Sequence, residues 1–309
     1  MKFELTADQR DFASSLDALL SAADTVGAAR AWAEGDHSPG LKLWERLAEQ
    51  GLPMLATEAT PVEVCIAFEA LGRHAVPGPW VESAAYLPVA LGREVEGIAT
   101  VAVPPHAPYA LDADVAEVVY LAGPDGVGEA EVGERRGSVD RTRRLFDVAP
   151  GGAAATDRAF DTAVLATSAQ LLGLGERVLA DTVTYAKQRR QFGREIGSYQ
   201  AIKHQLADVR IALDFARPLV HGAALSLVDP VETTPRAVSA AKVMCADAAY
   251  LAARTGLQVH GAIGYTSEFD LSIWITKIRA LLTAWGTPAF HRSRILDSLV
   301  APAPGSGGA

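Results

Sequence analysis

The feature of this sequence that most constrains its fold is an apolar seam whose residues recur in alternating steps of four and three. The seam comprises Ile202, Leu206, Val209, Leu213, Ala216 and Val220. Such spacing is typical of a long helix packed inside a bundle. Two further stretches keep helical spacing: Leu171, Leu174, Val178, Thr182 and Tyr185, and then Val238, Ala241, Cys245, Ala248 and Ala252. Two shorter helices are expected after them, so residues 157–300 are predicted to form a helical bundle of four or five members.

The rest of the chain divides by pattern into two further regions and a tail. Residues 1–96 are predicted to be helical, beginning with a cap at Thr6 and a capping-box partner at Gln9. Residues 97–156 contain short β-prone runs separated by Pro and Gly, which predicts a small region of four to six strands. Residues 301–309, with the sequence APAPGSGGA, are expected to be disordered from their composition.

Composition excludes several classes of protein. The 309 residues are 49% hydrophobic and 21% charged, which is ordinary for a globular protein with a sizeable core. A net charge of −9 argues against nucleic-acid binding. No apolar run approaches the roughly 20 residues of a membrane span, and the charged N-terminus lacks a signal core. We therefore expect a cytoplasmic protein that contacts no membrane.

Metal and disulfide chemistry are not predicted either. The two cysteines, Cys65 and Cys245, give no disulfide framework, and the seven histidines show no metal-ligand spacing. A local basic run is interpreted as a solvated loop face rather than as an anion site; it comprises Arg135, Arg136, Arg141, Arg143 and Arg144.

One segment carries a chemical signal, in which Arg189 and Phe192 lie three residues apart. At a helix end both side chains would face one side, so that the guanidinium could hold a phosphate while the ring offers a stacking face. The alternative is a helix C-terminus with favourable positive charge and a Gly stop at Gly193. Spacing by itself favours this structural interpretation.

Longer motifs connect the chain with a known family. Tyr185-Ala-x-x-Arg189-x-x-Phe192-Gly193, followed by Ile196 and Gln200, resembles a hallmark of acyl-CoA dehydrogenases. The stretch from Gln258 through Gly261 to Thr266 (QVHGAIGYT) is similar to a second hallmark. Further matches near the N-terminus and at Gly286-Thr287 extend the resemblance over nearly the whole chain.

The resemblance implies the fold class and the cofactor. The expected class is mainly α: an N-terminal helical domain over residues 1–96, a shortened central β domain over 97–156 and a C-terminal four-helix bundle over 157–300. The implied cofactor is FAD at a subunit interface. Arg189, Phe192, Gln258 and Gly261 would reach the FAD of the partner subunit, whereas Gly286 and Thr287 would touch the FAD of their own chain. For Gln200, a cofactor contact and a polar contact at a helix start both remain open.

Departures from the family pattern point to a divided enzyme. The family reaction removes a proton α to a thioester carbonyl, together with a β hydride, and it needs a carboxylate base. The two family positions for that base are occupied here by Trp285 and Ala163, and Val164 replaces a neighbouring Arg. The chain thus resembles the short, non-catalytic subunit of α2β2 acyl-CoA dehydrogenases of actinobacteria, whose paralogous partner carries the catalytic Glu. Steroid-derived acyl-CoA thioesters are the substrates that this resemblance implies.

Two alternatives stay open. The first is a self-sufficient acyl-CoA dehydrogenase with a relocated base, and the second is a flavin-free scaffold or CoA-thioester binding protein. Glu176, Asp181 and Glu268 lie near the motifs, but ion pairing, solvation or helix capping is the expected role of each. His260 is predicted to be a packed histidine that makes one backbone hydrogen bond. We also expect Trp285 to fill the space where the base would act.

Overall fold

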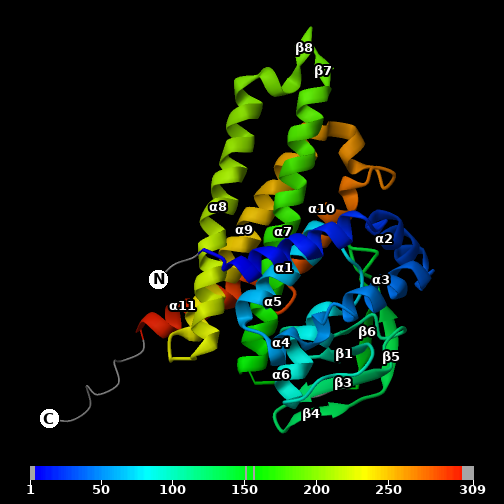
Figure 1. The fold of residues 1–309 in the computed structure, drawn as a ribbon, viewed down its shortest axis with the longest axis vertical. Coiled ribbons are helices and arrows are strands. Elements are labelled where there is room, and N and C mark those ends of the chain that lie inside the picture. Colours follow the sequence, from blue (N-terminus) through cyan, green and yellow to red (C-terminus); the bar gives the residue numbers. More distant parts are fainter. Residues whose placement is uncertain (1–3, 150–151, 156, 301–309) are drawn as a thin grey trace, which may run out of the picture.

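The computed structural model describes residues 4–149, 152–155 and 157–300, so the tail predicted to be disordered lies outside the described residues. Figure 1 shows a column of long helices, with shorter helices packed against its side and small sheets beside its lower end. The mainly helical class predicted from the sequence is confirmed. The domain boundaries stay a prediction.

The first hundred residues form short helices that begin at strong caps. Thr6 and Gln9 make the predicted capping box, and Thr60 makes a second one with Glu63. Five of the eight elements were not predicted from the sequence, namely α2, η1, α4, η2 and α6. The elements are α1 (Ala7–Ser21), α2 (Thr25–Glu34), α3 (Ser38–Ala48), η1 (Leu52–Met54), α4 (Leu55–Glu58), α5 (Pro61–Arg73), η2 (Glu82–Tyr86) and α6 (Leu87–Leu91).

The β region consists of two three-stranded sheets. Its strands are β1 (Ala99–Ala102), β2 (Ala110–Leu111), β3 (Val118–Gly123), β4 (Gly126–Glu129), β5 (Val132–Arg136) and β6 (Leu145–Val148). One sheet has the order β1-β3-β4 and the other has the order β2-β6-β5. β1 runs parallel to β3, and the other pairs in these sheets are antiparallel. The six strands confirm the prediction of four to six.

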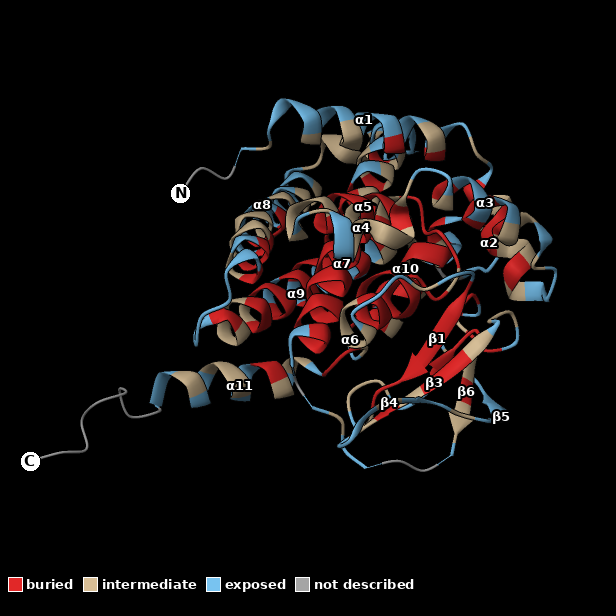
Figure 2. Ribbon diagram, turned by 60° about the horizontal axis from the view of Figure 1, so that its bottom comes forward, coloured by how far each residue is buried: buried red, intermediate tan, exposed pale blue. Residues whose placement is uncertain are grey.

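Three long helices and two shorter ones build the bundle. They are α7 (Arg158–Gln188), α8 (Gln200–Val228), α9 (Thr234–His260), α10 (Leu271–Leu281) and α11 (Pro288–Val300), with the hairpin β7 (Arg190–Gln191)–β8 (Arg194–Glu195) and the 3-10 turns η3 (Ile196–Ser198) and η4 (Gly261–Tyr265). The predicted seam of α8 is buried at Val209, Leu213, Ala216 and Val220. Figure 2 shows that α7 and α9, at the centre of the molecule, are also largely buried.

Glycines let α7 and α9 approach closely. A Cβ on Gly175 would lie 3.3 Å from Ala249 Cα, and one on Gly256 would lie 2.8 Å from Val178 Cγ1. The two contacts run in the same sequence direction on both helices. The C-terminal ends of α7 and α9 therefore meet at one end of the bundle, which is where the two motifs of the sequence lie.

Candidate functional site

Five of the seven predicted cofactor residues lie at that end. Tyr185 on α7 stacks on His260 on α9, with ring centroids 4.2 Å apart, and so joins the two motifs. Arg189 follows one turn after Tyr185, whereas Gln258 and Gly261 flank His260. Gln200 is the first residue of α8, beside the hairpin that Figure 1 shows beyond the ends of α7 and α8. We call Arg189, Phe192, Gln200, Gln258 and Gly261 the hairpin-end group.

The helical geometry expected for Arg189 and Phe192 is wrong. α7 ends at Gln188, and Arg189 is its extended C-cap residue, with ψ 122°. Phe192 lies in the turn of the β7–β8 hairpin with a φ of +52°, followed by Gly193 at +82°. The sequence pattern did not predict this hairpin, because its strands are only two residues long.

The side chains at this end face outward. Phe192 is 92% exposed, and Arg189 is also exposed. Within the part of the chain that the structure describes, the Arg189 guanidinium has no hydrogen-bond or ion-pair partner. An apolar ring that is so exposed, next to an unpaired guanidinium, is suited to contact another molecule.

His260 and Gly261 add to this fit. The imidazole is buried and its Nδ1 lies 2.7 Å from the Gly256 carbonyl oxygen, which confirms the single backbone bond. Its buried Nε2 has no partner among the described residues. Gly261 has a φ of +64°, and a Cβ there would meet nothing within 4 Å, so its backbone is open to a ligand. A phosphate, an aromatic ring and a hydrogen-bond donor, all present in FAD, match these groups.

Gly286 and Thr287 lie near the other end of the bundle. The preceding residue, Trp285, packs against Tyr86 and Phe160, with ring centroids 5.1 and 6.2 Å away. Phe160 lies in the first turn of α7, and Arg189 is the C-cap at the other end. The rise of the helix therefore separates Trp285 and its neighbours from the hairpin-end group by about 40 Å. The predicted residues could therefore contact two different cofactor molecules but not one.

The two positions that the resemblance assigns to the base hold Ala163 and Trp285, whose side chains accept no proton. Ala163 is fully buried on α7, and Trp285 is 1% exposed with a left-handed φ of +57°. The strained backbone is held by buried polar groups: His291 Nε2 lies 3.0 Å from the Trp285 carbonyl oxygen, and Lys242 Nζ donates to the Ala284 carbonyl at 2.8 Å. Burial lowers the pKa of Lys242 to about 7.

Trp285 does not close the local site, contrary to the expectation from the sequence. A cleft of about 640 Å³ lies beside it, between the β2–β6 sheet and the end of α10. Gly286 and Thr287 line this cleft, and so does Glu82 of η2. The indole instead fills the core behind the cleft, because Tyr86 and Phe160 provide its aromatic contacts.

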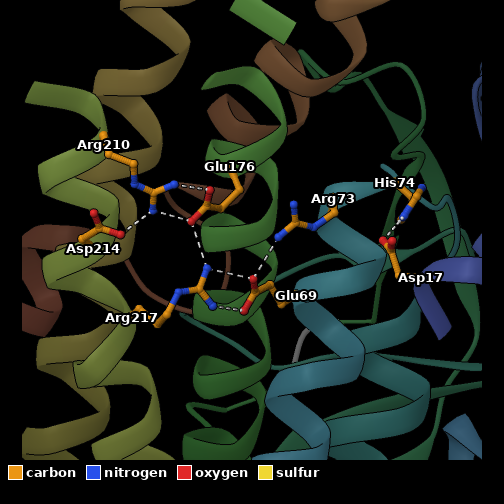
Figure 3. A network of polar contacts seen from close by, with 8 residues as sticks. All are labelled: Asp17, Glu69, Arg73, His74, Glu176, Arg210, Asp214 and Arg217. Atoms are coloured by element: carbon orange, nitrogen blue, oxygen red, sulfur yellow. Dashed lines mark hydrogen bonds and ion pairs between the residues drawn. The ribbon is translucent and has the colours of Figure 1, made fainter. Parts of the chain in front are cut away.

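The carboxylates near the motifs have structural roles (Figure 3). Glu176 accepts two hydrogen bonds from Arg210, both of 2.7 Å, and one of 2.9 Å from Arg217. Arg217 also reaches Glu69 on α5. Burial raises the pKa of Glu176, but the hydrogen bonds from the two arginines prevail and hold it below its ordinary value. The network joins α5, α7 and α8.

The other two carboxylates are also accounted for. Asp181 pairs with Arg177 at 2.8 Å, one turn away on α7, and Glu268 is exposed before α10. In contrast, the interpretation of the basic run is wrong at Arg144. That side chain is 2% exposed, pairs with Asp114 at 2.7 Å and lies over the Trp32 ring. Its partners Asp114 and Trp32 are distant in the chain, so the local pattern did not indicate this burial.

Comparisons with known proteins agree with the motifs. Residues 151–300 match the model of the acyl-CoA dehydrogenase C-terminal domain. The chain is 28% identical over 291 residues to an acyl-CoA dehydrogenase, IpdE2, of Mycolicibacterium smegmatis, covering 87% of this chain and 91% of that protein.

Solved structures share the fold. The ChsE4-ChsE5 complex of Mycobacterium tuberculosis superimposes with a TM-score of 0.80 at 19% identity, covering 98% of this chain and all of that chain. The Tcur3481-Tcur3483 steroid ACAD variant gives 0.75 at 20% identity, over 94% and 97% of the two chains. A glutaryl-CoA dehydrogenase of Mycobacterium smegmatis in complex with FADH2 gives 0.80 at 16% identity, over 97% and 96%.

Proposed function

We propose that the chain is a member of the acyl-CoA dehydrogenase family and, within it, a subunit that completes the FAD site of a paralogous partner. The observation that carries the proposal is a contrast within one chain. The hairpin-end group keeps an exposed Arg189 and Phe192 beside an open Gly261, whereas the base positions hold Trp285 and Ala163. Residues that would serve a neighbour are retained, and the chain's own base is missing.

Each residue of the hairpin-end group has a role in this proposal. The Arg189 guanidinium binds the pyrophosphate through charge-assisted hydrogen bonds, and the Phe192 ring contacts the adenine side. The open backbone at Gly261 lets the pyrophosphate approach, and Gln258 and Gln200 contribute polar contacts. Bound there, FAD would supply the hydride acceptor for the β carbon of the acyl thioester. The α proton leaves to a carboxylate of the partner subunit.

The substrate class and the assembly follow from the relatives. The ChsE4-ChsE5 structure is a complex of two named chains, and the Tcur3481-Tcur3483 structure is described as a steroid ACAD. These likenesses support an α2β2 heterotetramer that dehydrogenates a steroid-derived acyl-CoA. The glutaryl-CoA dehydrogenase described in complex with FADH2 supports an FAD-containing complex.

The experiment compares two adjacent arginines. The chain is co-expressed with the acyl-CoA dehydrogenase paralogue encoded nearest to it, and the flavin content and turnover of the complex are measured. R189Q should weaken flavin retention about 10- to 100-fold, the cost of a lost hydrogen bond to a charged group. R190Q is the matched control, because Arg190 is exposed and pairs with Glu195 at 3.1 Å, and it should change retention less than about 3-fold. Unchanged flavin content in R189Q would show that Arg189 does not bind the FAD.

One observation favours a second candidate, the self-sufficient enzyme. Glu82 is a buried carboxylate that lines the cleft beside Trp285, which makes it the residue to examine as a relocated base. Purification of the chain alone separates the two candidates. A colourless, inactive chain that gains flavin and activity with its paralogue supports the subunit. A yellow chain that oxidises an acyl-CoA, and loses that activity in E82Q, supports the self-sufficient enzyme.

A further inference from the structure

Arg30 connects the N-terminal helices to the segment that follows the second sequence motif. It lies on α2, and its guanidinium donates to the carbonyl oxygens of Ser267 and Glu268 at 3.1 and 2.9 Å. It also donates to Asp270 Oδ1, through Nη2 at 2.7 Å and through Nε at 3.2 Å. These acceptors lie 237 to 240 positions away along the chain. One arginine thus holds residues 267–270, which we call the clamped segment.

The clamped segment is held by hydrogen bonds more than by apolar packing. Residues 266–268 and Asp270 are exposed. A cavity of about 200 Å³ lies between α2 and the start of α10, and both Arg30 and Ser267 line it. Asp270 is the N-cap residue of α10, but its side chain makes no capping hydrogen bond and pairs with Arg30 instead. Because aspartate is among the best N-cap residues, the pair with Arg30 forms at the expense of a cap.

The clamped segment carries an aromatic ring to the hairpin-end group. Phe269 is half-buried and packs against His260, with ring centroids 5.1 Å apart. The same imidazole stacks on Tyr185 of α7, at 4.2 Å. Gln258 and Gly261 flank His260 in the chain. A shift of Phe269 would therefore free one contact of the imidazole and loosen the backbone that carries these two residues.

We propose that Arg30 is a positioning residue, which fixes the clamped segment so that Phe269 holds His260 and the hairpin-end group keeps the geometry that binds a cofactor. Arg30 acts through Phe269 and does not itself contact the cofactor. A site whose groups are loosely held binds more weakly, because ordering them on binding costs free energy. The last link rests on the proposed function, whereas the links from Arg30 to Phe269 and from Phe269 to His260 are properties of the chain alone.

The first experiment follows the clamped segment and His260 in the purified chain. Burial lowers the pKa of His260. R30Q should raise this pKa toward its ordinary value of 6.5, measured by NMR with labelled histidines and assigned through H260Q. Amide hydrogen exchange in 267–270 should become about 10-fold faster, the cost of lost hydrogen bonds to a charged group. R136Q is the matched control, because Arg136 is exposed and pairs with Asp147 at 2.8 Å in the β region.

R136Q should leave both readings unchanged. An R30Q variant with the exchange and the His260 titration of the natural chain would overturn the proposal, because Arg30 would then hold nothing in place.

A double-mutant cycle tests the link through Phe269. F269L removes the ring, keeps an apolar side chain and leaves Arg30 intact, so it should raise the pKa of His260 by itself. R30Q should add little to the His260 titration in the F269L background, because the effect of Arg30 passes through that ring. Fully additive effects of the two substitutions would show that Arg30 does not act through Phe269.

The last measurement uses the complex with the paralogue. R30Q should weaken flavin retention about 3- to 10-fold, the cost of ordering a side chain on binding. R30K keeps the charge without the planar fork and should give an intermediate loss, whereas R136Q should give none. If R189Q weakens retention and R30Q does not, the positioning role fails and the proposed function stands. If neither substitution changes retention, the proposed function fails as well.

Discussion

At the scale of single residues, Glu82 shows how a buried acid couples stability to pH. Its pKa in the folded chain is about 6, against an ordinary value of 4.5, because burial disfavours the charged form. The folded state therefore holds the proton more tightly than the unfolded state does. The contribution of Glu82 to stability is greatest below pH 4.5 and is lost as the pH rises through 6.

The E82Q variant isolates this effect. Relative to E82Q, the natural chain should lose about 2 kcal/mol in its free energy of unfolding between pH 4.5 and pH 7.5. Urea titrations at several pH values measure the difference, and other titrating groups cancel between the two proteins. E94Q, at an exposed residue, should show no such trend. A constant difference between the natural chain and E82Q would mean that burial does not perturb this carboxyl.

A glycine near the cleft is fixed by packing. Gly286 has a φ of +100°, and a Cβ there would lie 2.6 Å from His291 Nε2 and 2.7 Å from Phe290 Cδ1. Gly35 has a similar φ of +95°, but a Cβ added there would meet nothing within 4 Å. A substitution at Gly35 therefore costs only the backbone strain. We expect G286A to lose about 3 kcal/mol and G35A about 1 kcal/mol in urea unfolding. Equal losses of unfolding free energy in G286A and G35A would mean that residues 283–287 can shift to accommodate the added Cβ.

At the scale of helices, the network of Figure 3 connects α5, α7 and α8 through charge rather than through apolar packing. Glu176 is its centre, with a side chain that is 10% exposed between two arginines. Loss of this carboxylate would leave Arg210 with Asp214 and Arg217 with Glu69, and it would remove the negative charge that lies between the two arginines. E176Q should therefore cost about 1–3 kcal/mol in the free energy of unfolding at pH 7.

The control for the network is Asp181 on the same helix. It forms a half-exposed pair with Arg177, so D181N should cost less than about 0.5 kcal/mol. The excess cost of E176Q should shrink as the pH falls and the natural Glu176 is protonated, because the arginines stabilise only its charged form. An excess that persists at pH 3 would contradict the electrostatic origin.

Periodicity and caps predicted most of the helices, but short elements escaped. The seam of α8 and the cap at Thr6 are local signals, and the structure follows them. The β7–β8 hairpin escaped because its strands are only two residues long. The turn η2 packs against α7 and β1, which are distant segments that a single sequence does not display. The cleft beside Trp285 was also missed, because Glu82 and Arg143 lie 61 positions apart in the sequence and line the same cleft only in the fold.

At the scale of the whole molecule, α8 presents an apolar outer face. Ile211, Phe215 and Leu219 recur every fourth residue and are 51%, 66% and 37% exposed. By length and composition α8 could cross a membrane, but its most apolar window is one-third buried within the chain, and core helices of soluble proteins pass the same test. A face of this kind is typical of a helix that a partner covers.

Substitution on this face tests the proposed assembly as a whole. F215E should prevent the mixed tetramer, because a carboxylate would be buried in the apolar contact without a partner. The folded chain alone should keep its stability within about 0.5 kcal/mol, since Phe215 is exposed there. V132E places the same charge on an exposed apolar residue of β5 and should leave the tetramer intact. Native mass and flavin absorbance of the co-purified complex measure both results. A tetramer that persists in F215E would show that the interface does not include this face of α8. Loss of both the tetramer and the flavin would show that the cofactor site is completed only when the subunits assemble.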